Sequence, residues 1–480
     1  MSIDTRQPSG GGAPDARTES ADYLEKRSLK SGSAGWILLA GLGVSYVISG
    51  DFSGWNGGLA EGGFGGLLIA FGIIAVMYFC MVLGMAELSS ALPAAGGGYT
   101  FARAALGPWG GFATGAAVLI EYTIAPAAIA TFIGAYVESL HLFGITDGWW
   151  VYLAVYAIFM AIHLTGAGEA LKTMFVITAI ALVGLVVFVV AALGMFHPAN
   201  LTNIPVDQAA AGASPFLPFG TLGIWAALPF AIWFFLAVEG VPLAAEEADD
   251  PAKDVPRGII LAMCALVVTG ALVLVLAPGA GGAQQIAESG NPLVLALGDS
   301  VWARVVNYIG LAGLVASFFS IMYAYSRQTF ALSRAGYLPT RLSVTNSRKA
   351  PVLAIVVPGV IGFVLSLTGQ GAMLLNMAVF GAAVSYVLIM VSHIVLRVKQ
   401  PALVRPYKTP GGIATTAVAL VIAAASVIAT FLVDVRAAGL TFAAFAAMMA
   451  YFGLYSRHHL VANSPDEEFA ALTSAEGEVA

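Results

Sequence analysis

Long apolar stretches alternate with short segments rich in Gly, Pro and charge along most of the 480-residue chain. An apolar helix of roughly 20 residues is long enough to cross the hydrocarbon core of a bilayer. The pattern therefore predicts an all-α integral membrane protein with twelve transmembrane helices. These helices are expected near residues 34–58, 64–91, 110–140, 149–165, 172–195, 219–243, 257–278, 304–333, 351–368, 372–396, 413–433 and 437–456.

Two polar segments flank the apolar part of the chain. Residues 1–33 are rich in Pro, Gly and Ser and lack the apolar run of a signal peptide, and residues 460–480 are acidic. Segments of such composition bury too little apolar surface to fold. Both are predicted to be disordered tails.

Composition narrows the class of protein further. Hydrophobic residues make up 59% of the chain and charged residues 10%, against roughly 25% charged in soluble domains. The two cysteines, Cys80 and Cys264, lie inside apolar stretches without disulfide or metal-ligand spacing. The sequence predicts no cofactor, no metal site, no nucleic-acid binding and no nucleophile–base pair, so an enzyme is disfavoured.

The basic residues orient the predicted helices. If the N-terminus is cytoplasmic, all of the 21 Lys and Arg residues except Arg304 and Arg436 fall in cytoplasmic segments. Cytoplasmic loops of membrane proteins carry such an excess of Lys and Arg. We expect a multi-pass protein of a bacterial inner membrane with both termini in the cytoplasm.

Two of the predicted helices are interrupted by glycine and polar residues. The first helix contains VISGDFSG at 47–54, and the sixth contains FLAVEGVP at 235–242. A pair of broken helices at matching positions in two halves is typical of secondary transporters built from inverted repeats. We therefore expect inverted repeats at 34–195 and 219–396, with two further helices at 413–456.

The first break combines backbone groups with a charge. Unwinding would free the carbonyls of Val47, Ile48 and Ser49 for a cation, and Gly50 would let a ligand approach closely. Asp51 would repel a substrate carboxylate and attract an ammonium group, and intramembrane acids are usually functional. The alternative is that Asp51 only caps the second half of the helix.

The second break and its surroundings supply further candidates. Glu239 could bind a cation, carry a proton or cap the following segment, whereas Glu121 of the third helix either faces the cavity or bonds a neighbouring helix. An aromatic ring such as Trp233 or Phe235 would hold an ammonium group by a cation–π contact worth about 2 kcal/mol. Ser320 of the eighth helix offers a hydroxyl to a substrate, unless it bonds its own backbone.

Three motifs resemble those of the amino acid–polyamine–organocation (APC) transporters. They are GMAELSSALPAAGGGYTFARAALGPWGGF at 84–112, AAEEADDPAKDVPRGI at 244–259 and RPYKTPGG at 405–412. The resemblance covers about residues 30–456. It implies a LeuT-like (APC) fold, with a five-plus-five inverted repeat and broken helices 1 and 6.

The sequence of the first helix most resembles that of the ethanolamine permeases. It reads GWILLAGLGVSYVISGDFSGWNGGLAEGGFGG at 35–66. Amino acid carriers of the family usually have a Gly-Ser-Gly turn here that holds the substrate carboxylate. This chain has Ile48 in place of the first glycine and Asp51 after the turn, which fits an amine without a carboxylate. The resemblance also implies that Trp233 stacks on the substrate and that Glu239 takes part in gating and protonation, with Ala237 where glycine is usual.

The sequence does not decide which ion, if any, drives transport. Some proton-coupled relatives place a lysine within helix 5, but Lys172 lies only at the edge of that helix here. A proton on Glu239, Asp51 or Glu121, a sodium ion near the serines Ser317 and Ser320, and plain exchange all remain.

The sequence thus predicts a secondary active transporter that imports ethanolamine or a closely related small amine by alternating access. The alternative is an amino acid or polyamine carrier of the same superfamily, in which Asp51 would be only a cap.

Overall fold

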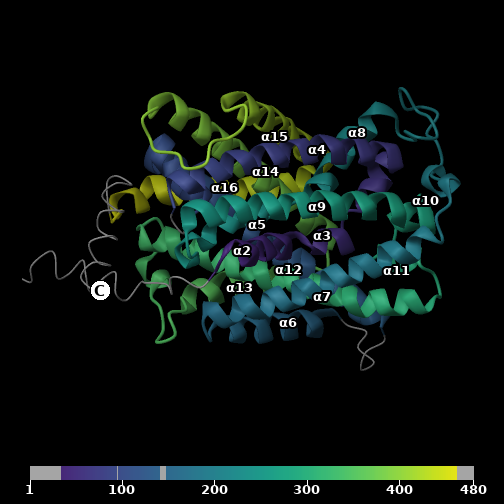
Figure 1. Ribbon diagram of the computed structural model, residues 1–480, viewed down its shortest axis with the longest axis horizontal. Helices are drawn as coiled ribbons and strands as arrows, with labels where there is room; N and C mark the ends of the chain where they lie inside the picture. Colours follow the sequence, from purple (N-terminus) through teal and green to yellow (C-terminus); the bar gives the residue numbers. More distant parts are fainter. Residues whose placement is uncertain (1–33, 94–95, 141–147, 462–480) are drawn as a thin grey trace, which may run out of the picture.

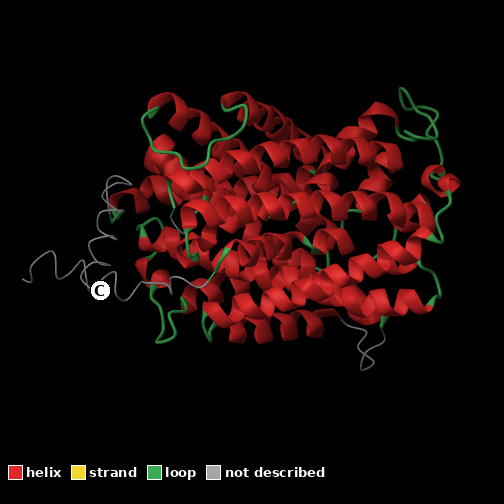
Figure 2. Ribbon diagram, viewed as in Figure 1, coloured by secondary structure: helices red, strands yellow, loops and turns green. Residues whose placement is uncertain are grey.

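The computed structural model describes residues 34–93, 96–140 and 148–461. The predicted tails, 1–33 and nearly all of 460–480, lie outside the described residues. Within the described part, every extended element is a helix, and the only β-bridges are isolated pairs, Ala34 with Ala248 and Thr345 with Pro351 (Figure 2). The all-α prediction is therefore confirmed for these residues.

Nine helical segments in the described part of the chain are long and apolar enough to cross a membrane. They are α4 (Gly57–Ala91), α5 (Gly98–Ser139), α7 (Ala167–Leu193), α8 (Gly220–Trp233) continued by the 3-10 helix η3 (Val238–Glu247), α9 (Pro251–Gly281), α12 (Val301–Arg334), α14 (Gly371–Lys399), α15 (Ile413–Val433) and α16 (Val435–Leu454).

Three shorter apolar helical segments complete the set of predicted spans. They are α2 (Trp36–Val47) with α3 (Ser49–Phe52), α6 (Gly148–His163) and α13 (Val352–Ser366). A helix therefore stands at each of the twelve predicted places, while twelve crossings and the inverted repeat stay predictions. The remaining short elements are η2 (Pro198–Thr202), α10 (Ala283–Ala287), α11 (Pro292–Ala296), η4 (Thr340–Ser343) and η5 (Ser456–His458).

Two glycines divide long helices where the sequence predicted a helix start. Gly63 in α4 has φ 67° and Gly107 in α5 has φ 76°, a region that residues with a Cβ avoid. Pro108 then begins the main part of α5, where a missing N–H is tolerated. The residues before Gly107, which were predicted as a loop, instead form a short helix from Gly98 that buries Arg103.

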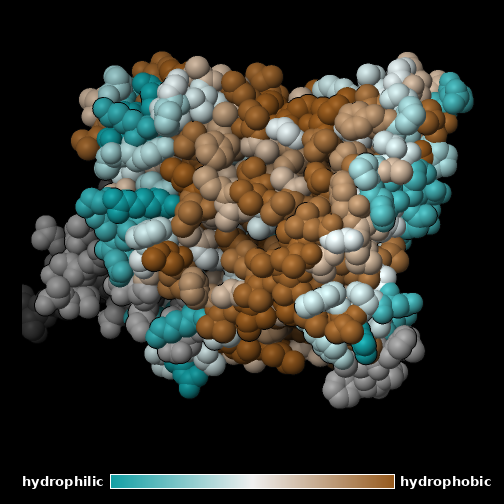
Figure 3. Space-filling model, turned by 45° about the vertical axis from the view of Figure 1, so that its right-hand side comes forward, coloured by the Kyte–Doolittle hydropathy of each residue, from teal (hydrophilic) through white to brown (hydrophobic). Residues whose placement is uncertain are grey.

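The long helices lie side by side, roughly along the horizontal of Figure 1, with α10 and α11 at the right-hand end. A broad band of apolar side chains covers the face shown in Figure 3, and polar residues gather toward its two ends. Apolar residues such as Val183, Val186 and Val190 of α7 are exposed. A band of this kind is the surface that a bilayer covers.

The first and sixth helices lie at the centre of the bundle. Helix 1, which is α2 with α3, packs against α7, α9, η3 and α12. Helix 6, which is α8 with η3, packs against α4 and α9. The long contact of α5 with α14 and α12 encloses them from another side. The predicted site residues on these helices are consequently buried.

Candidate functional site

Helix 1 is interrupted at one hydrogen bond rather than unwound. Ile48, between α2 and α3, keeps right-handed helical angles, with φ −56° and ψ −22°. The Ser49 N–H donates to the Ser317 hydroxyl at 2.8 Å, and that hydroxyl donates to the Ser45 carbonyl at 2.8 Å. A hydroxyl from α12 is thus inserted between two groups that would bond each other in an unbroken helix.

For Ile48 and Ser49, this geometry corrects the expectation that unwinding frees their carbonyls. The carbonyls of Ile48 and Ser49 already accept backbone N–H groups, from Asp51 at 3.1 Å and from Ser53 at 3.0 Å. Their oxygens are therefore not released by unwinding. Any further bond they make to a ligand would use the second lone pair of a carbonyl that is already bonded.

Ser320 belongs to the same serine cluster between helix 1 and α12. Its hydroxyl donates to the Ala316 carbonyl of its own helix at 2.6 Å and contacts the Ser45 hydroxyl. Ser317 and Ser320 are fully buried. In this arrangement both serines join two helices, so neither hydroxyl is left over for a substrate.

Asp51 is buried with its charge unmatched. Its side chain is 1% exposed, and neither carboxylate oxygen has a hydrogen-bond partner within the described part of the chain. It makes no capping bond to the start of α3. The Thr269 side chain of α9 lies beside the carboxyl. The capping alternative is therefore wrong for this structure, and the carboxyl faces α9.

Gly50 brings helices 1 and 6 into direct contact. A Cβ at this position would lie 2.5 Å from the carbonyl oxygen of Trp233 and 3.3 Å from Cα of Phe234. Only glycine permits this approach of two backbones. Three consecutive residues of helix 1 thus contact three different helices: Ser49 contacts α12, Gly50 contacts α8, and Asp51 contacts α9.

The chain turns sharply after α3, and Trp233 holds the turn. Ser53 is extended, with φ −161° and ψ 160°, and Gly54 has φ 92°. The Trp233 indole N–H donates to the Ser53 carbonyl at 3.0 Å. The predicted partners of helices 1 and 6 do meet here, through the backbone and the indole N–H.

In helix 6, unlike helix 1, the backbone itself leaves the helical conformation. α8 ends at Trp233, and Ala237 takes the left-handed conformation with φ 77° before η3 begins at Val238. A residue with a Cβ is strained by roughly 1–2 kcal/mol in this region. Phe235, in the break, packs against Phe71 and Tyr78 of α4 with ring centroids 5.2 and 5.3 Å away.

Glu239, in the first turn of η3, sits in a cage of tyrosines. The Tyr122 hydroxyl donates to Oε1 at 2.9 Å, and the Tyr386 hydroxyl donates to Oε2 at 3.1 Å. Tyr386 also bonds the Tyr78 hydroxyl at 2.8 Å. The carboxyl of Glu121, which is fully buried, faces that of Glu239 and acts on it directly. The structure therefore brings together two of the three acids that the sequence named as possible proton carriers.

Contacts close the bundle at the end where helix 1 begins. The Ala34 N–H donates to the Glu247 carbonyl at 3.0 Å, which pins the start of helix 1 to the end of η3. The Glu247 carboxylate in turn accepts from Arg327 of α12 at 2.6 Å and from Tyr323.

The opposite end of the bundle is closed as well. The Asn56 side chain, just past helix 1, donates to the carbonyls of Ile286 at 2.9 Å and Ser289 at 2.8 Å. The Ser53 hydroxyl donates to the Gly290 carbonyl at 3.2 Å. Between these contacts the acids of the two breaks are buried, Asp51 at 1% exposure and Glu239 at 3%.

All three sequence motifs contain residues with a structural role away from this centre. Glu87 of the first motif accepts from Arg397 at 2.9 Å, from the Thr409 N–H at 2.7 Å, and pairs with Arg405 at 3.0 Å. It anchors the loop that carries RPYKTPGG. At the start of α9, the Lys253 ammonium bonds Asp250 and holds the pKa of that exposed carboxyl below its usual range.

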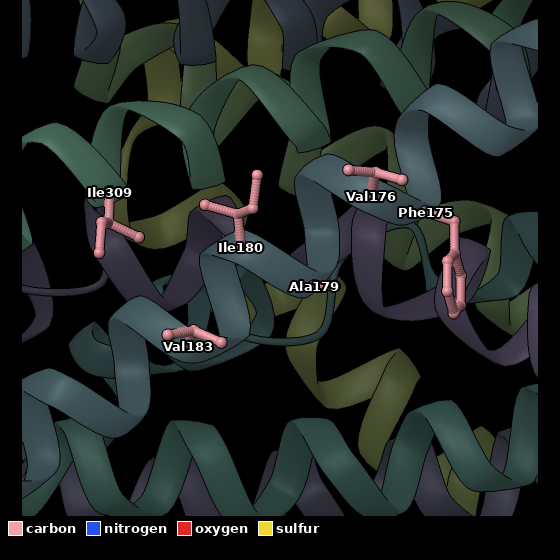
Figure 4. Close-up of a pocket in the computed structure, with 6 residues that line it drawn as sticks. All are labelled: Phe175, Val176, Ala179, Ile180, Val183 and Ile309. Atoms are coloured by element: carbon pink, nitrogen blue, oxygen red, sulfur yellow. The ribbon is translucent and has the colours of Figure 1, made fainter.

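A pocket of about 340 Å³ lies on the outside of the bundle between α7 and α12 (Figure 4). All of its lining residues are apolar: Phe175, Val176, Ala179, Ile180, Val183 and Ile309. Because it faces the apolar surface and offers no polar partner, it is unrelated to the buried carboxyls.

Some residues of the centre were missed by the sequence analysis. Tyr122 directly follows Glu121 in the sequence, so its position was available as a signal. Tyr78, Tyr386 and Thr269 carry no local signal, because they reach the carboxyls only through the packing of α4, α14 and α9.

A membrane protein whose two central helices are both broken beside buried carboxyls has the build of a secondary transporter. The family model described as amino acid permease matches residues 36–467, and the chain belongs to that family, within the APC superfamily. The superfamily resemblance of the motifs is thereby confirmed.

Several curated relatives are bacterial transporters of moderate similarity. An uncharacterized transporter of Rhizobium meliloti is 28% identical over 402 residues, covering 82% of this chain and 85% of its own. The branched-chain amino acid permease BcaP of Bacillus subtilis is 29% identical, covering 72% of this chain and 77% of its own. The methylthioribose transporter of the same species is 27% identical, covering 82% and 87%. The family and these relatives are thus transporters rather than enzymes.

Proposed function

We propose that this transporter imports a small organic amine without a carboxylate, such as ethanolamine, across a bacterial cytoplasmic membrane. In this proposal twelve helices cross the membrane, both termini are cytoplasmic, and helices 1–5 and 6–10 form the inverted repeats. One helix bundle rocks past the other around the breaks, which gives alternating access.

The observation that carries the proposal is the unpartnered carboxyl of Asp51. A buried carboxylate without a hydrogen bond or a counter-charge is strongly unfavourable in a membrane protein. A substrate ammonium group would supply both the positive charge and the N–H donors that this carboxyl lacks. The Thr269 hydroxyl beside it donates to the Leu266 carbonyl at 3.3 Å, so its oxygen is left to accept from a substrate hydroxyl or ammonium.

The same position argues against a substrate carboxylate at helix 1. The Ser49 N–H, which would otherwise be a donor for such a group, is already bonded to Ser317. A carboxylate placed at this turn would also lie two residues from the Asp51 carboxyl and be repelled by it. The break in helix 1 therefore favours a cation over a zwitterion.

Trp233 and Gly50 limit the size of the substrate in this proposal. Helices 1 and 6 touch at these residues and would have to separate to admit a ligand. A molecule with few non-hydrogen atoms requires the least separation. The Trp233 ring is then free to lie over the ammonium group as helix 6 moves.

Uptake of labelled ethanolamine into proteoliposomes that hold the purified protein tests the proposal. Unlabelled choline, putrescine, leucine, alanine and arginine would be added in turn as competitors. The proposal predicts uptake that amines reduce and that the three amino acids leave unchanged. Absence of ethanolamine uptake together with saturable leucine or alanine uptake would overturn it.

A second candidate, an amino acid carrier, is favoured by the relatives named as branched-chain amino acid permeases. In that case the substrate carboxylate would need donors other than the Ser49 N–H, and the ammonium group would lie at Asp51. Leucine uptake that ethanolamine does not inhibit would favour this candidate.

A further inference from the structure

The Glu121–Glu239 pair has an imbalance of hydrogen-bond donors. Glu239 receives one tyrosine hydroxyl on each carboxylate oxygen, whereas neither oxygen of Glu121 has a donor within the described part of the chain. Both side chains are buried, Glu121 completely and Glu239 to within 3%. Two groups that only accept hydrogen bonds when ionised therefore face each other.

Within the described part of the chain, no positive charge is paired with either carboxyl. None of the described ion pairs involves either carboxyl. Arg327 acts instead on Glu247 and Tyr323, farther along η3 and α12. The titratable groups that face the pair are tyrosines from four elements: Tyr46 of α2, Tyr78 of α4, Tyr122 of α5 and Tyr386 of α14.

A single proton resolves this imbalance. Placed on Glu121, it converts one of two facing acceptors into a donor and leaves one negative charge on Glu239. The hydroxyls of Tyr122 and Tyr386 already point at Glu239 and stabilise a charge there. Without the proton, two negative charges meet in a buried space and repel each other strongly.

We propose that Glu121 and Glu239 bind one coupling proton between α5 and η3, with Glu121 as its carrier. The inference deepens the proposed function, on which it rests, by naming the ion that drives import. The proton is taken from water on one side of the membrane and returned to water on the other, with no other bond made or broken.

The position of the pair links the proton to the moving part of helix 6. Glu239 lies two residues after Ala237, where the helix breaks. Tyr122 and Tyr386 fix η3 to α5 and α14 through Glu239. Loss of the proton from Glu121 adds repulsion across this contact and favours separation of η3 from α5. Return of the proton favours the closed arrangement seen here.

A metal ion fits the pair less well than a proton. Within the described residues, no group of three or more His, Cys, Asp or Glu side chains could hold a metal. Two tyrosine hydroxyls already donate to the Glu239 oxygens, so fewer lone pairs are left there for the six to eight oxygen contacts of a cation such as Ca²⁺.

The test uses proteoliposomes of the full chain and the variant Glu121→Gln, whose amide imitates a permanently protonated acid. Exchange of labelled substrate without a gradient and accumulation driven by an imposed pH gradient are measured side by side. The substrate is ethanolamine or, where ethanolamine is not taken up, leucine. Glu138→Gln, the same change at an exposed position of α5, serves as the matched control.

The proposal predicts that Glu121→Gln loses the effect of the pH gradient, so that driven accumulation falls by about 10-fold, while exchange falls far less. Glu138→Gln keeps both. Gradient-driven accumulation by Glu121→Gln at the wild-type level would overturn the proposal. So would wild-type uptake that a sodium gradient drives and a pH gradient does not.

A second measurement begins with the wild-type protein and does not depend on the folding of Glu121→Gln. Infrared difference spectra of the wild-type protein between acidic and alkaline pH report the C=O band of a protonated carboxyl. The proposal predicts such a band at neutral pH, which Tyr386→Phe shifts because it removes one donor from Glu239. A spectrum without a buried carboxyl band at any pH would contradict the proposal. Absence of ethanolamine uptake alone would contradict the proposed substrate. It would not contradict the proposed proton site, which the infrared band tests separately.

Discussion

Helix 1 and helix 6 are both interrupted beside a buried acid, but the two interruptions are built from different parts. In helix 1 the backbone stays right-handed at Ile48, and the Ser317 hydroxyl replaces one hydrogen bond. In helix 6 the backbone leaves the helix at Ala237 and resumes as a 3-10 helix. The first interruption is held by a neighbouring helix, and the second by the chain itself.

The buried acids at the two interruptions, Asp51 and Glu239, also differ in their hydrogen bonds. Asp51 has no hydrogen-bond partner among the described residues, whereas Glu239 is bonded by two tyrosines and faces Glu121. A carboxyl without a protein partner, such as that of Asp51, is suited to bind a substrate. A carboxyl held by two hydroxyls, such as that of Glu239, is suited to keep a fixed negative charge. We therefore propose that the break in helix 1 binds the substrate and that the break in helix 6 couples the ion. The following changes test this division.

The largest effect is expected where the two helices touch. Gly50→Ala places a methyl group 2.5 Å from the Trp233 carbonyl oxygen, so the backbones must separate. We expect a loss of about 2–3 kcal/mol of stability from overpacking, with loss of transport. Gly72→Ala is the control, because nothing lies within 4 Å of its added methyl group. Thermal unfolding and uptake that match wild type in Gly50→Ala would refute the direct contact.

An intermediate effect is expected for the hydroxyl that bridges helix 1. Ser317→Ala removes the partner of the Ser49 N–H and the Ser45 carbonyl, and the helix regains only part of the loss by closing its own bond. We expect a destabilisation of about 1–2 kcal/mol, measured by thermal unfolding in detergent.

Ser385→Ala is the matched control for Ser317→Ala. Its hydroxyl is buried but bonds only the Ala382 carbonyl of its own helix, at 2.8 Å. The control should lose about 0.5 kcal/mol or less. Equal losses at the two serines would mean that the hydroxyl of Ser317 has no special role in helix 1.

The smallest effect, of opposite sign, is expected at the break in helix 6. Ala237→Gly relieves the left-handed strain at φ 77°, and we expect a gain of about 0.5–1 kcal/mol. Ala231→Gly, within α8, should lose about 1 kcal/mol, because that position is regular helix. A loss of stability in Ala237→Gly similar to that in Ala231→Gly would show that residue 237 does not adopt the left-handed conformation.

The positions of the helices were predictable from the sequence because hydrophobic length and Gly or Pro punctuation act locally. Gly63 and Pro108 mark helix starts close to the predicted ones. The segment from Gly98 to Leu106 was not predicted as a helix, because Arg103 reads as a loop charge until its burial within the bundle is known.

The geometry of the breaks was predictable only in part. Gly and a carboxylate marked where each helix is interrupted, but not how. Whether a helix unwinds depends on what neighbouring helices supply, and Ser317 lies 268 residues from Ser49. The pairing of Glu121 with Glu239 likewise depends on the packing of α5 against helix 6, which local sequence does not encode.

The most direct test of the division between the breaks is the dissociation constant of ethanolamine for wild type, Asp51→Asn and Asp299→Asn, the last an exposed control. The account predicts that Asp51→Asn weakens binding by about 100-fold while folding is retained, since a buried charge is removed. Asp299→Asn should bind like wild type. An unchanged dissociation constant in a folded Asp51→Asn variant would remove Asp51 from the substrate site and contradict the account.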